Sequence, residues 1–596
     1  MADIQPRGLS RGLTNYGDAD FSLYLRRSFA SSMGYSRQML DRPIVGICHS
    51  ASGFNNCHRH VPEMIEAVKR GVLSSGALPI EFPTISLGEL FLVPTSLKFR
   101  NLMSMDVEEM IRAQPMDAVV LVGGCDKTVP AQLMGAASAD LPTIQLVTGP
   151  MSTSRYRGER LGACTDCRRF WARYRAGEMS DSEIDAVERR FAPTAGTCAV
   201  MGTASTMASI AEALGMMPAG AAAVPAVDAD RLRIAEETGC AAVALIRSER
   251  RPSQIINDKA LENALRVLLA IGGSTNAVIH LAAIAGRLGL SFDLKRLNEL
   301  SETTPVIVNL KPTGLHYMED LSAAGGIPAV MRELRNLLHL NCITVTGETI
   351  GERLAAWNTW VDRSVIHSVD DPILPDGGLT ILFGSLAPGG AVIKRSAANP
   401  RLFEQEARCI VFASLDDLAS RIDDPGLDVA PDDFLVLKNA GPRSAAAMPE
   451  AGYLPIPRKL ARMGVKDMVR ISDARMSGTA FGTVVLHVTP DASSGGPLAL
   501  VRTGDRIRLS VREHRLDLLV EADELDRRRS ALALETSSAG SHARGYSWLY
   551  DTFITQANEG CDFAFLRKGG INKAFTLNEV PNTLGSETGV NRALEG

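Results

Sequence analysis

The sequence predicts an α/β protein with two domains, an amino-terminal domain built on a parallel sheet and a mostly β carboxy-terminal domain. Two observations lead to this prediction. Up to about residue 375, short apolar runs such as "RPIVGICHS" and "DAVVLVGG" alternate with helical patterns such as "HVPEMIEAVKRGVL", as expected for parallel strands joined by helices. From about residue 378, short runs such as "DFLVLKNAGP" and "TVVLHVTP" are separated by Gly, Pro and Asp, which is typical of a β domain.

The segment between the α/β pattern and the β pattern has the composition of a linker. Residues 368–378 read "SVDDPILPDGG", and Pro, Asp and Gly together interrupt regular structure. We therefore expect an α/β domain over residues 1–375 and a mostly β domain over residues 376–596. Each part is long enough for a core of its own.

Composition and charge narrow the classes of partner. The chain has 45% hydrophobic residues, 22% charged residues and a net charge of -5, so we expect an ordinary globular protein with no nucleic-acid and no membrane partner. The start "MADIQPRGLSRGL" lacks the apolar core of a secretory signal, and we expect a cytoplasmic protein. Ten cysteines in 596 residues are too few for a disulfide scaffold. Acidic metabolites are the candidate ligands.

Three cysteines stand in loops that lead into helices. Cys57 follows an expected strand and precedes a helix, Cys125 in "GGCDKT" follows the strand 119–122, and Cys198 precedes a helical run. Open α/β sheets bind ligands at the carboxyl ends of their strands, and helix amino termini favour thiolates. Together the three suggest a shared metal centre, although any one alone is more simply a small buried residue. Spacing alone does not decide between these two interpretations.

Eight short strings occur in an order that is similar to that of a known family. They are "CHRH", "GGCDKT", "GTCAVMGTASTM", "GGSTNAVIHL", "VLKNAGP", "MPEAG", "DARMSGTAFG" and "QANEGCDF". Together they resemble the dihydroxy-acid and sugar-acid dehydratase family. The resemblance implies a β-barrel-like carboxy-terminal domain, an iron–sulfur cluster, a magnesium ion and the elimination of water from a 2,3-dihydroxy acid to give a 2-keto-3-deoxy acid.

The resemblance assigns the cluster to Cys57, Cys125 and Cys198. It also implies a cluster of the two-iron two-sulfur type. Three thiolates leave one iron coordination position for an outside oxygen, so that the cluster acts as a Lewis acid.

The resemblance assigns the magnesium to Glu89, Asp126, Lys127 and Glu450. Magnesium takes oxygen ligands, which an ammonium group does not offer, and the family solves this with a carbamylated lysine. A cluster ligand and two magnesium ligands then stand side by side in "CDK". Without the resemblance, both glutamates would be interpreted as surface acids.

The resemblance makes Ser477 the base that removes the C2 proton, with Lys127 the second residue of the catalytic set. A histidine or lysine would be the usual expectation for this role. From the residues alone, Ser477 in "ARMSG" is interpreted as a turn residue.

Other motifs receive simpler interpretations. The pair Cys164 and Cys167 has half of a zinc-site spacing, but a structural zinc needs four ligands, and we expect this pair not to bind metal. His58 and His60 are expected at a helix start, with His58 as a wall of the site. The string "GGSTN" (272–276) lacks the lysine of a phosphate-binding loop and is interpreted as a helix cap.

Three short sequence strings favour one branch of the family. "SLGE", "MGTASTM" and "AAVPAVDADR" resemble arabinonate and xylonate dehydratases, so we expect a small-molecule sugar acid as substrate and a homodimer or homotetramer. The alternatives are a dihydroxy-acid dehydratase of branched-chain amino-acid synthesis and a non-catalytic paralogue. The sequence departs from the branch near Cys57, at Cys164 and Cys167, in "GPRSAAAMPE" and in the tail from residue 575, which leaves the particular sugar acid open.

Overall fold

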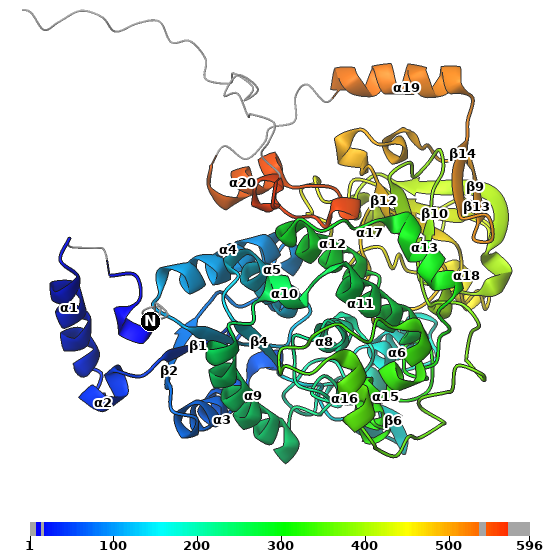
Figure 1. Ribbon diagram of the computed structural model, residues 1–596. Coiled ribbons are helices and arrows are strands. Elements are labelled where there is room, and N and C mark those ends of the chain that lie inside the picture. The colour runs from blue at the N-terminus through cyan, green and yellow to red at the C-terminus, as the bar shows by residue number, and fades with distance from the viewer. Residues whose placement is uncertain (1–6, 14–16, 536–543, 570–596) are drawn as a thin grey trace, which may run out of the picture.

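The structure is a computed structural model that describes residues 7–13, 17–535 and 544–569 (Figure 1). The unusual tail from residue 575 lies outside the described residues.

The amino-terminal part is built on a four-stranded parallel sheet in the order β2-β1-β3-β4. Its strands are β1 (Ile44–His49), β2 (Leu78–Pro83), β3 (Ala118–Gly123) and β4 (Thr143–Val147). The central strand β3, "AVVLVG", is buried along its whole length, because helices cover both faces of a parallel sheet. The predicted parallel sheet is confirmed.

Helices surround this sheet and extend beyond it (Figure 1). Those up to the linker are α1 (Ala19–Ser31), α2 (Arg37–Leu40), α3 (Val61–Ser74), α4 (Ser96–Ala113), α5 (Thr128–Ala139), α6 (Thr165–Arg175), α7 (Asp181–Glu188), α8 (Thr203–Ala213), α9 (Ala229–Ser248), α10 (Pro252–Ile255), α11 (Asp258–Ala270), α12 (Asn276–Leu288), α13 (Leu294–Glu302), α14 (Met318–Ala323), α15 (Gly326–Glu333) and α16 (Ile350–Ala356). Two of them, α8 and α12, are buried at every position.

The carboxy-terminal part holds a mixed eight-stranded sheet in the order β14-β13-β9-β10-β11-β12-β8-β7. Its strands are β7 (Thr380–Leu382), β8 (Gly390–Ile393), β9 (Glu404–Phe412), β10 (Phe434–Leu437), β11 (Arg470–Ser472), β12 (Val484–Thr489), β13 (Arg506–Ser510) and β14 (Arg515–Leu519). The run from β9 to β12 is parallel and the outer pairs are antiparallel. Its helices are α17 (Leu415–Arg421), α18 (Arg458–Arg462), α19 (Ala522–Glu535) and α20 (Gly545–Phe553).

The eight-stranded sheet curls until its two edges nearly meet. Phe383, just after β7, donates its N–H to the carbonyl of His514 at 2.9 Å, and its own carbonyl accepts from the N–H of Leu516 at 2.9 Å. Pairing of the two edges satisfies backbone groups that an open sheet leaves exposed. The expected barrel-like form is confirmed.

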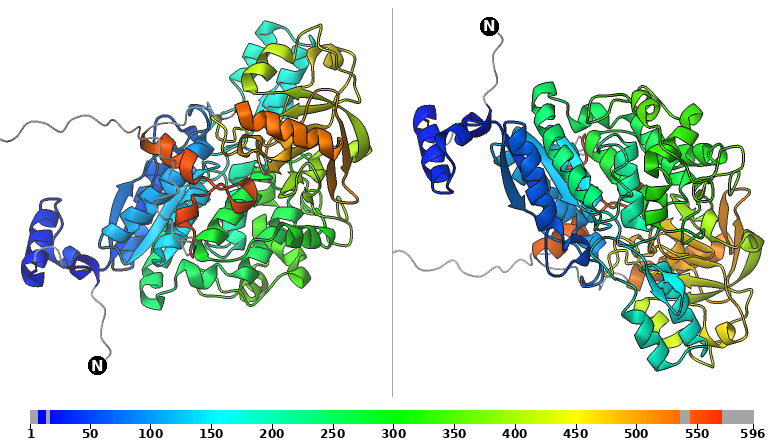
Figure 2. Two further views of the ribbon diagram at one scale, coloured as in Figure 1. Left: turned by 90° about the horizontal axis from the view of Figure 1, so that it is seen from above. Right: turned by 90° about the horizontal axis from the view of Figure 1, so that it is seen from below.

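Contacts cross the expected domain boundary in both directions. The segment β5 (Ser154–Tyr156), β6 (Glu159–Leu161), α6 and α7 reaches the carboxy-terminal part, where Arg175 pairs with Asp423 at 2.8 Å; Figure 2 shows this cyan segment beside the yellow-green strands and helices. The stretch around α20 returns to the amino-terminal helices, where Asp562 pairs with Arg287. The division at residues 375 and 376 stays a prediction.

Among the helices of the described ranges, none has the length and apolar character needed to cross a membrane.

Candidate functional site

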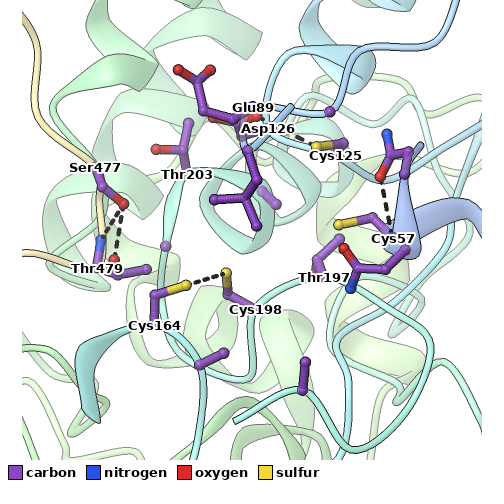
Figure 3. A pocket seen from close by; sticks show the side chains of 18 of the residues that line it. Cys57, Glu89, Cys125, Asp126, Cys164, Thr197, Cys198, Thr203, Ser477 and Thr479 are labelled. Atoms are coloured by element: carbon purple, nitrogen blue, oxygen red, sulfur yellow. Dashed lines mark hydrogen bonds between the residues drawn. The ribbon is translucent and has the colours of Figure 1, made fainter. Parts of the chain in front are cut away.

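One pocket gathers loops from both sheets. It has a volume of about 280 Å³, and Figure 3 shows its lining side chains facing one another. It contains every sequence-predicted site residue except Lys127, namely Cys57, Glu89, Cys125, Asp126, Cys198, Glu450 and Ser477. The loops after β1, β3, β10 and β11 all contribute, as expected where parallel strands end.

Cys57 lies in a 3₁₀ turn, Asn56–His58, between β1 and α3. The side chain of Asn55 fixes this turn, because its Oδ1 accepts from the N–H of Cys57 at 3.1 Å and its Nδ2 donates to the carbonyl of Leu87 at 3.0 Å. The loop that follows β1 is therefore tied to the loop that carries Glu89.

His58 is a structural support. It is fully buried, and its Nε2 accepts from the N–H groups of Gly124 at 3.0 Å and Cys125 at 3.2 Å. The other ring nitrogen, Nδ1, donates to the carbonyl of Ser50 at 3.0 Å. Burial lowers the pKa of His58 to about 4, which keeps the ring neutral at pH 7. Both ring nitrogens are engaged, so His58 positions the Cys125 loop and is not free to act as a base.

Four of the five cysteines that line the pocket lie in two pairs. Contact with Cys57 and burial raise the pKa of Cys125 well above that of a free thiol. Contact with Cys164 and burial do the same for Cys198, and the two sulfur atoms are 3.6 Å apart. Figure 3 shows Cys57 and Cys125 together on one wall and Cys164 and Cys198 together on another.

Glu89 is held at the amino terminus of α4. Its Oε1 accepts from the hydroxyl of Thr95 at 2.8 Å, and its Oε2 accepts from the N–H of Ser96 at 3.3 Å and from the Ser96 hydroxyl. Burial opposes ionisation, but the charges of Arg475 and Lys127 lower the pKa of Glu89 to about 2. The side chain is therefore ionised, as a magnesium ligand has to be.

Arg475 joins the two glutamates. Its side chain is completely buried, and one guanidinium nitrogen donates to both carboxylate oxygens of Glu89 at 3.0 Å. The other donates to Oε1 of Glu450 at 2.6 Å. Burial raises the pKa of Glu450. Arg475 is a site residue that sequence reasoning missed, although it stands in the string "DARMSG" two positions before Ser477.

Asp126 and Lys127 occupy the short loop between β3 and α5. Lys127 is fully buried behind the pocket wall, and its Nζ donates to Oδ2 of Asp126 at 2.5 Å. A buried ammonium requires such a partner. The amine is therefore placed next to the carboxylates and not out in solvent.

Ser477 lies in the loop between β11 and β12, across the pocket from Cys57 and Cys125 (Figure 3). Its hydroxyl is 2.8 Å from the Oγ1 of Thr479 and accepts from the N–H of Thr479 at 3.4 Å. Thr479 can therefore direct two donors at the serine oxygen. Such donors stabilise negative charge on that atom.

The structure also shows the roles of His60 and of the string "GGSTN", for which the sequence predicted a position at a helix start and a helix cap. His60 is buried and its Nε2 contacts the carbonyl of Thr148 at 2.8 Å, so it braces the sheet. The string "GGSTN" leads into α12, whose first residue is Asn276. The hydroxyl of Ser274 accepts from the N–H of Asn276 at 3.2 Å, while the N-cap residue Thr275 makes no side-chain cap bond.

The donor atoms that line the pocket are of two kinds, sulfur and carboxylate oxygen. In the part of the chain that the structure describes, no group of three or more His, Cys, Asp or Glu side chains gathers around a single point. A two-iron cluster places its thiolates on two separate irons, so paired cysteines suit it. The carboxylates of Glu89, Asp126 and Glu450 offer the hard oxygen atoms that magnesium takes, and in the structure they form ion pairs with two cations, Arg475 and Lys127.

Comparisons with known proteins agree on one group. Residues 42–353 match the amino-terminal domain of the dihydroxy-acid/6-phosphogluconate dehydratases, and residues 364–561 match their carboxy-terminal domain. The chain is 44% identical to 6-deoxy-6-sulfo-D-gluconate dehydratase of Pseudomonas putida, over 92% of this chain and 94% of the relative. It is 43% identical to L-arabinonate dehydratase of Rhizobium leguminosarum bv. trifolii (strain WSM2304), over 93% and 95%. Identity to dihydroxy-acid dehydratase of Acetivibrio thermocellus is 37%, over 90% and 96%.

Proposed function

Because the chain belongs to the dihydroxy-acid/6-phosphogluconate dehydratase family and is a dehydratase, we propose that it eliminates water from a sugar acid, an aldonic acid, to give a 2-keto-3-deoxy acid. The observation that carries the proposal is the shared pocket, in which Ser477 lies opposite Cys57 and Cys125 and the carboxylates line the same cavity (Figure 3). The higher identity to the two sugar-acid dehydratases than to the dihydroxy-acid dehydratase supports the sugar-acid class.

The residues present fit both inorganic groups of the proposal. Cys57, Cys125 and Cys198 would hold a two-iron two-sulfur cluster. Glu89, Asp126, Glu450 and a carbamylated Lys127 would hold magnesium. When bound, the two groups supply Lewis acidity toward the substrate carboxylate and hydroxyl oxygens. Because Lys127 Nζ contacts the carboxylate of Asp126, a carbamate formed on Lys127 would place its oxygen atoms beside another of the proposed magnesium ligands.

The protein residues of the reaction are Ser477 and its neighbour. Ser477 Oγ would take the proton from C2 of the substrate, and Thr479, 2.8 Å away, would donate to the serine oxygen in its anionic form. General-base catalysis of this kind contributes about 10²- to 10⁴-fold. His58 is excluded from the role, since both of its ring nitrogens are hydrogen-bonded within the protein.

The mouth of the pocket has an apolar rim. Phe54, Leu90 and Phe91 line it and are exposed by 76%, 82% and 67%. Exposed apolar side chains gathered in this way mark a surface that another molecule covers. We include a homodimer or homotetramer in the proposal for this reason, and light scattering coupled to size exclusion tests it.

A substrate panel tests the proposed reaction. The protein is purified without oxygen, reconstituted with iron and sulfide, and supplied with magnesium. We expect 2-keto acid from at least one five- or six-carbon aldonic acid, and no product after chelation of magnesium. The dihydroxy acid 2,3-dihydroxy-3-methylbutanoate is the matched comparison. Turnover of that acid with no turnover of any aldonic acid would replace the proposal by the branched-chain alternative.

A further inference from the structure

The pocket contains a fourth thiol that the three-cysteine ligand set does not use. Cys164 begins the pair Cys164 and Cys167, and both line the pocket. The Sγ atom of Cys164 lies 3.6 Å from that of Cys198. All ten cysteines of the chain are described and carry free thiols, so this contact is not a disulfide bond.

The backbone fixes the position of Cys164 beside Cys198. The carbonyl of Ala163 accepts from the N–H of Ala199 at 3.0 Å, which joins the two chain segments at the residues next to the cysteines. On the other side, the hydroxyl of Thr165 donates to the carbonyl of Thr479 at 3.0 Å. Cys164 is therefore held between Cys198 and the loop of Ser477.

Buried charge strengthens the same anchor. Asp166 is fully buried, and it accepts from the N–H of Gly162 at 2.9 Å, from Nζ of Lys311 at 2.9 Å and from the hydroxyl of Tyr317 at 2.8 Å. A buried carboxylate with this many donors holds one geometry. These hydrogen bonds anchor the turn from Gly162 to Asp166, and with it the backbone position of Cys164.

The sulfur separation suits two thiolates on one metal. A tetrahedral centre with metal–sulfur bonds of about 2.3 Å keeps its sulfur atoms about 3.8 Å apart, close to the observed 3.6 Å. Cys57 and Cys125 form the other pair, on another wall of the same pocket (Figure 3). Two pairs of cysteines are the ligand pattern of a two-iron two-sulfur cluster with four protein thiolates.

We propose that Cys164 is a fourth thiolate ligand of the cluster in the substrate-free enzyme, sharing one iron with Cys198 while Cys57 and Cys125 share the other, and that its bond to iron breaks when a substrate oxygen takes that position. The inference deepens the proposed function and depends on it. It also revises the sequence-based expectation that Cys164 and Cys167 stay free of metal, because sequence spacing did not place Cys164 beside Cys198. Cys167 remains outside the ligand set, as a thiol that contacts Cys164.

The proposal distinguishes Cys164 from its neighbour. Replacing Cys164 leaves three thiolates, so the cluster should persist with one altered iron. Replacing Cys167 removes a thiol from the same pocket wall and leaves all four ligands, which makes Cys167→Ala the matched control for Cys164→Ala.

Spectroscopy of the substrate-free protein tests the proposal without recourse to activity. In the unchanged protein reconstituted with ⁵⁷Fe, we expect Mössbauer spectra in which both ferric sites have the isomer shift of all-sulfur coordination. In Cys164→Ala we expect about the same iron content, two distinguishable iron sites, a changed electron paramagnetic resonance spectrum after reduction, and cluster loss in air several-fold faster. Cys167→Ala should match the unchanged protein.

The measurements distinguish an error in the Cys164 assignment from an error in the proposed function. Two inequivalent sites already in the unchanged protein would overturn ligation by Cys164 and leave the proposed function intact. A protein that takes up no iron on reconstitution would instead overturn the cluster of the proposed function. Because the Mössbauer measurement needs no variant, it decides the matter even if Cys164→Ala fails to fold.

Discussion

Within the described residues, Arg475 is the side chain whose hydrogen bonds reach both glutamates of the candidate magnesium site. A guanidinium presents several donors in a fixed plane, and lysine cannot reproduce that geometry. Here one fork spans Glu89 and Glu450, so the separation of the two carboxylates depends on it. A residue that orients metal ligands in this way acts on the metal without touching it.

We predict that Arg475→Lys weakens magnesium binding by about 10- to 100-fold, the usual effect of losing a group that orients metal ligands. The measurement is the magnesium concentration at half-maximal activity, together with cluster absorbance. Arg470→Lys is the control, because Arg470 is similarly buried but bonds to Asp467 and to the carbonyl of Tyr453. Equal shifts in magnesium dependence for both variants would show that Arg475 has only a packing role.

Replacing Ser477 tests the proposed acid–base role independently of the proposed metal ligands. We predict that Ser477→Ala keeps the iron and magnesium content of the unchanged protein and lowers turnover by at least about 10²-fold, because a general base is lost. Loss of deuterium from substrate labelled at C2 reports the proton transfer directly and should fall to background. The control Thr479→Val removes only the hydroxyl that contacts Ser477, and we expect a smaller loss. A Ser477→Ala protein that still dehydrates substrate within a few-fold of the normal rate would remove the serine from the mechanism.

Some of the residues that line the pocket could be grouped from the sequence for a physical reason. Cys57 and Cys125 follow strands, so periodicity alone places them at one edge of the parallel sheet. Glu89, Glu450 and Ser477 lie in loops, which have no periodic sequence pattern. These three residues were selected only because the surrounding strings resemble those of the dehydratase family. Arg475 and Cys164 escaped because their importance comes from contacts over long sequence distances, to Glu89 and to Cys198.

At the scale of elements, the loop of Ser477 rests on the starts of two buried helices. The hydroxyl of Thr203, first residue of α8, contacts that of Ser274, just before α12, at 2.8 Å. Gly478 fits against this joint: a Cβ atom there would lie 2.7 Å from the Cβ of Ser274 and 2.8 Å from the N atom of Thr203. The absence of a side chain at Gly478 therefore sets how closely Ser477 approaches the helices.

We predict that Gly478→Ala lowers turnover more than it lowers stability. The added methyl group forces the loop outward, with a cost of about 1 to 3 kcal/mol for overpacking, and Ser477 moves with it. Turnover and the midpoint of denaturant unfolding are the two measurements. Gly426→Ala is the control, since the nearest atom to its added Cβ is a carboxylate oxygen of Asp424 at 3.3 Å. Full activity in Gly478→Ala would mean that the loop adjusts freely.

The strands of the parallel sheet could be predicted from the sequence, but the closure of the barrel-like sheet could not. The parallel strands β1 and β3 were clear, since a fully apolar run between helical patterns has few other interpretations. The closure of the barrel was not visible in residue patterns, because it depends on Phe383 meeting the segment from His514 to Leu516, about 130 positions later. Pairing over such a separation is set by the whole sheet and leaves no local signal.

At the scale of the whole molecule, the stretch around α20 ties the end of the described chain to the amino-terminal helices. Arg287 on α12 and Asp562 are both completely buried and lie 2.6 Å apart, and Arg287 also contacts Glu108 on α4 at 3.3 Å. Arg100 donates to the carbonyls of Gly560 and Cys561 at 2.8 and 2.6 Å. The stretch after α20 therefore packs against α4 and α12, and it stabilises the amino-terminal part that carries part of the pocket.

We predict that Asp562→Ala destabilises the whole protein by about 3 to 5 kcal/mol, because it leaves the guanidinium of Arg287 buried without its main partner. The matched control is Glu559→Ala, three residues away, which removes an ion pair with Arg567 whose side chains are 46% and 32% exposed; an exposed pair contributes only about 0.2 to 1 kcal/mol. Chemical denaturation followed by circular dichroism and by cluster absorbance measures both variants. Since the brace joins α4 and α12 to the end of the described chain, the two signals should be lost together in Asp562→Ala. Unfolding of the α20 stretch alone, with the cluster absorbance retained, would show that the brace is local and that the pocket does not depend on it.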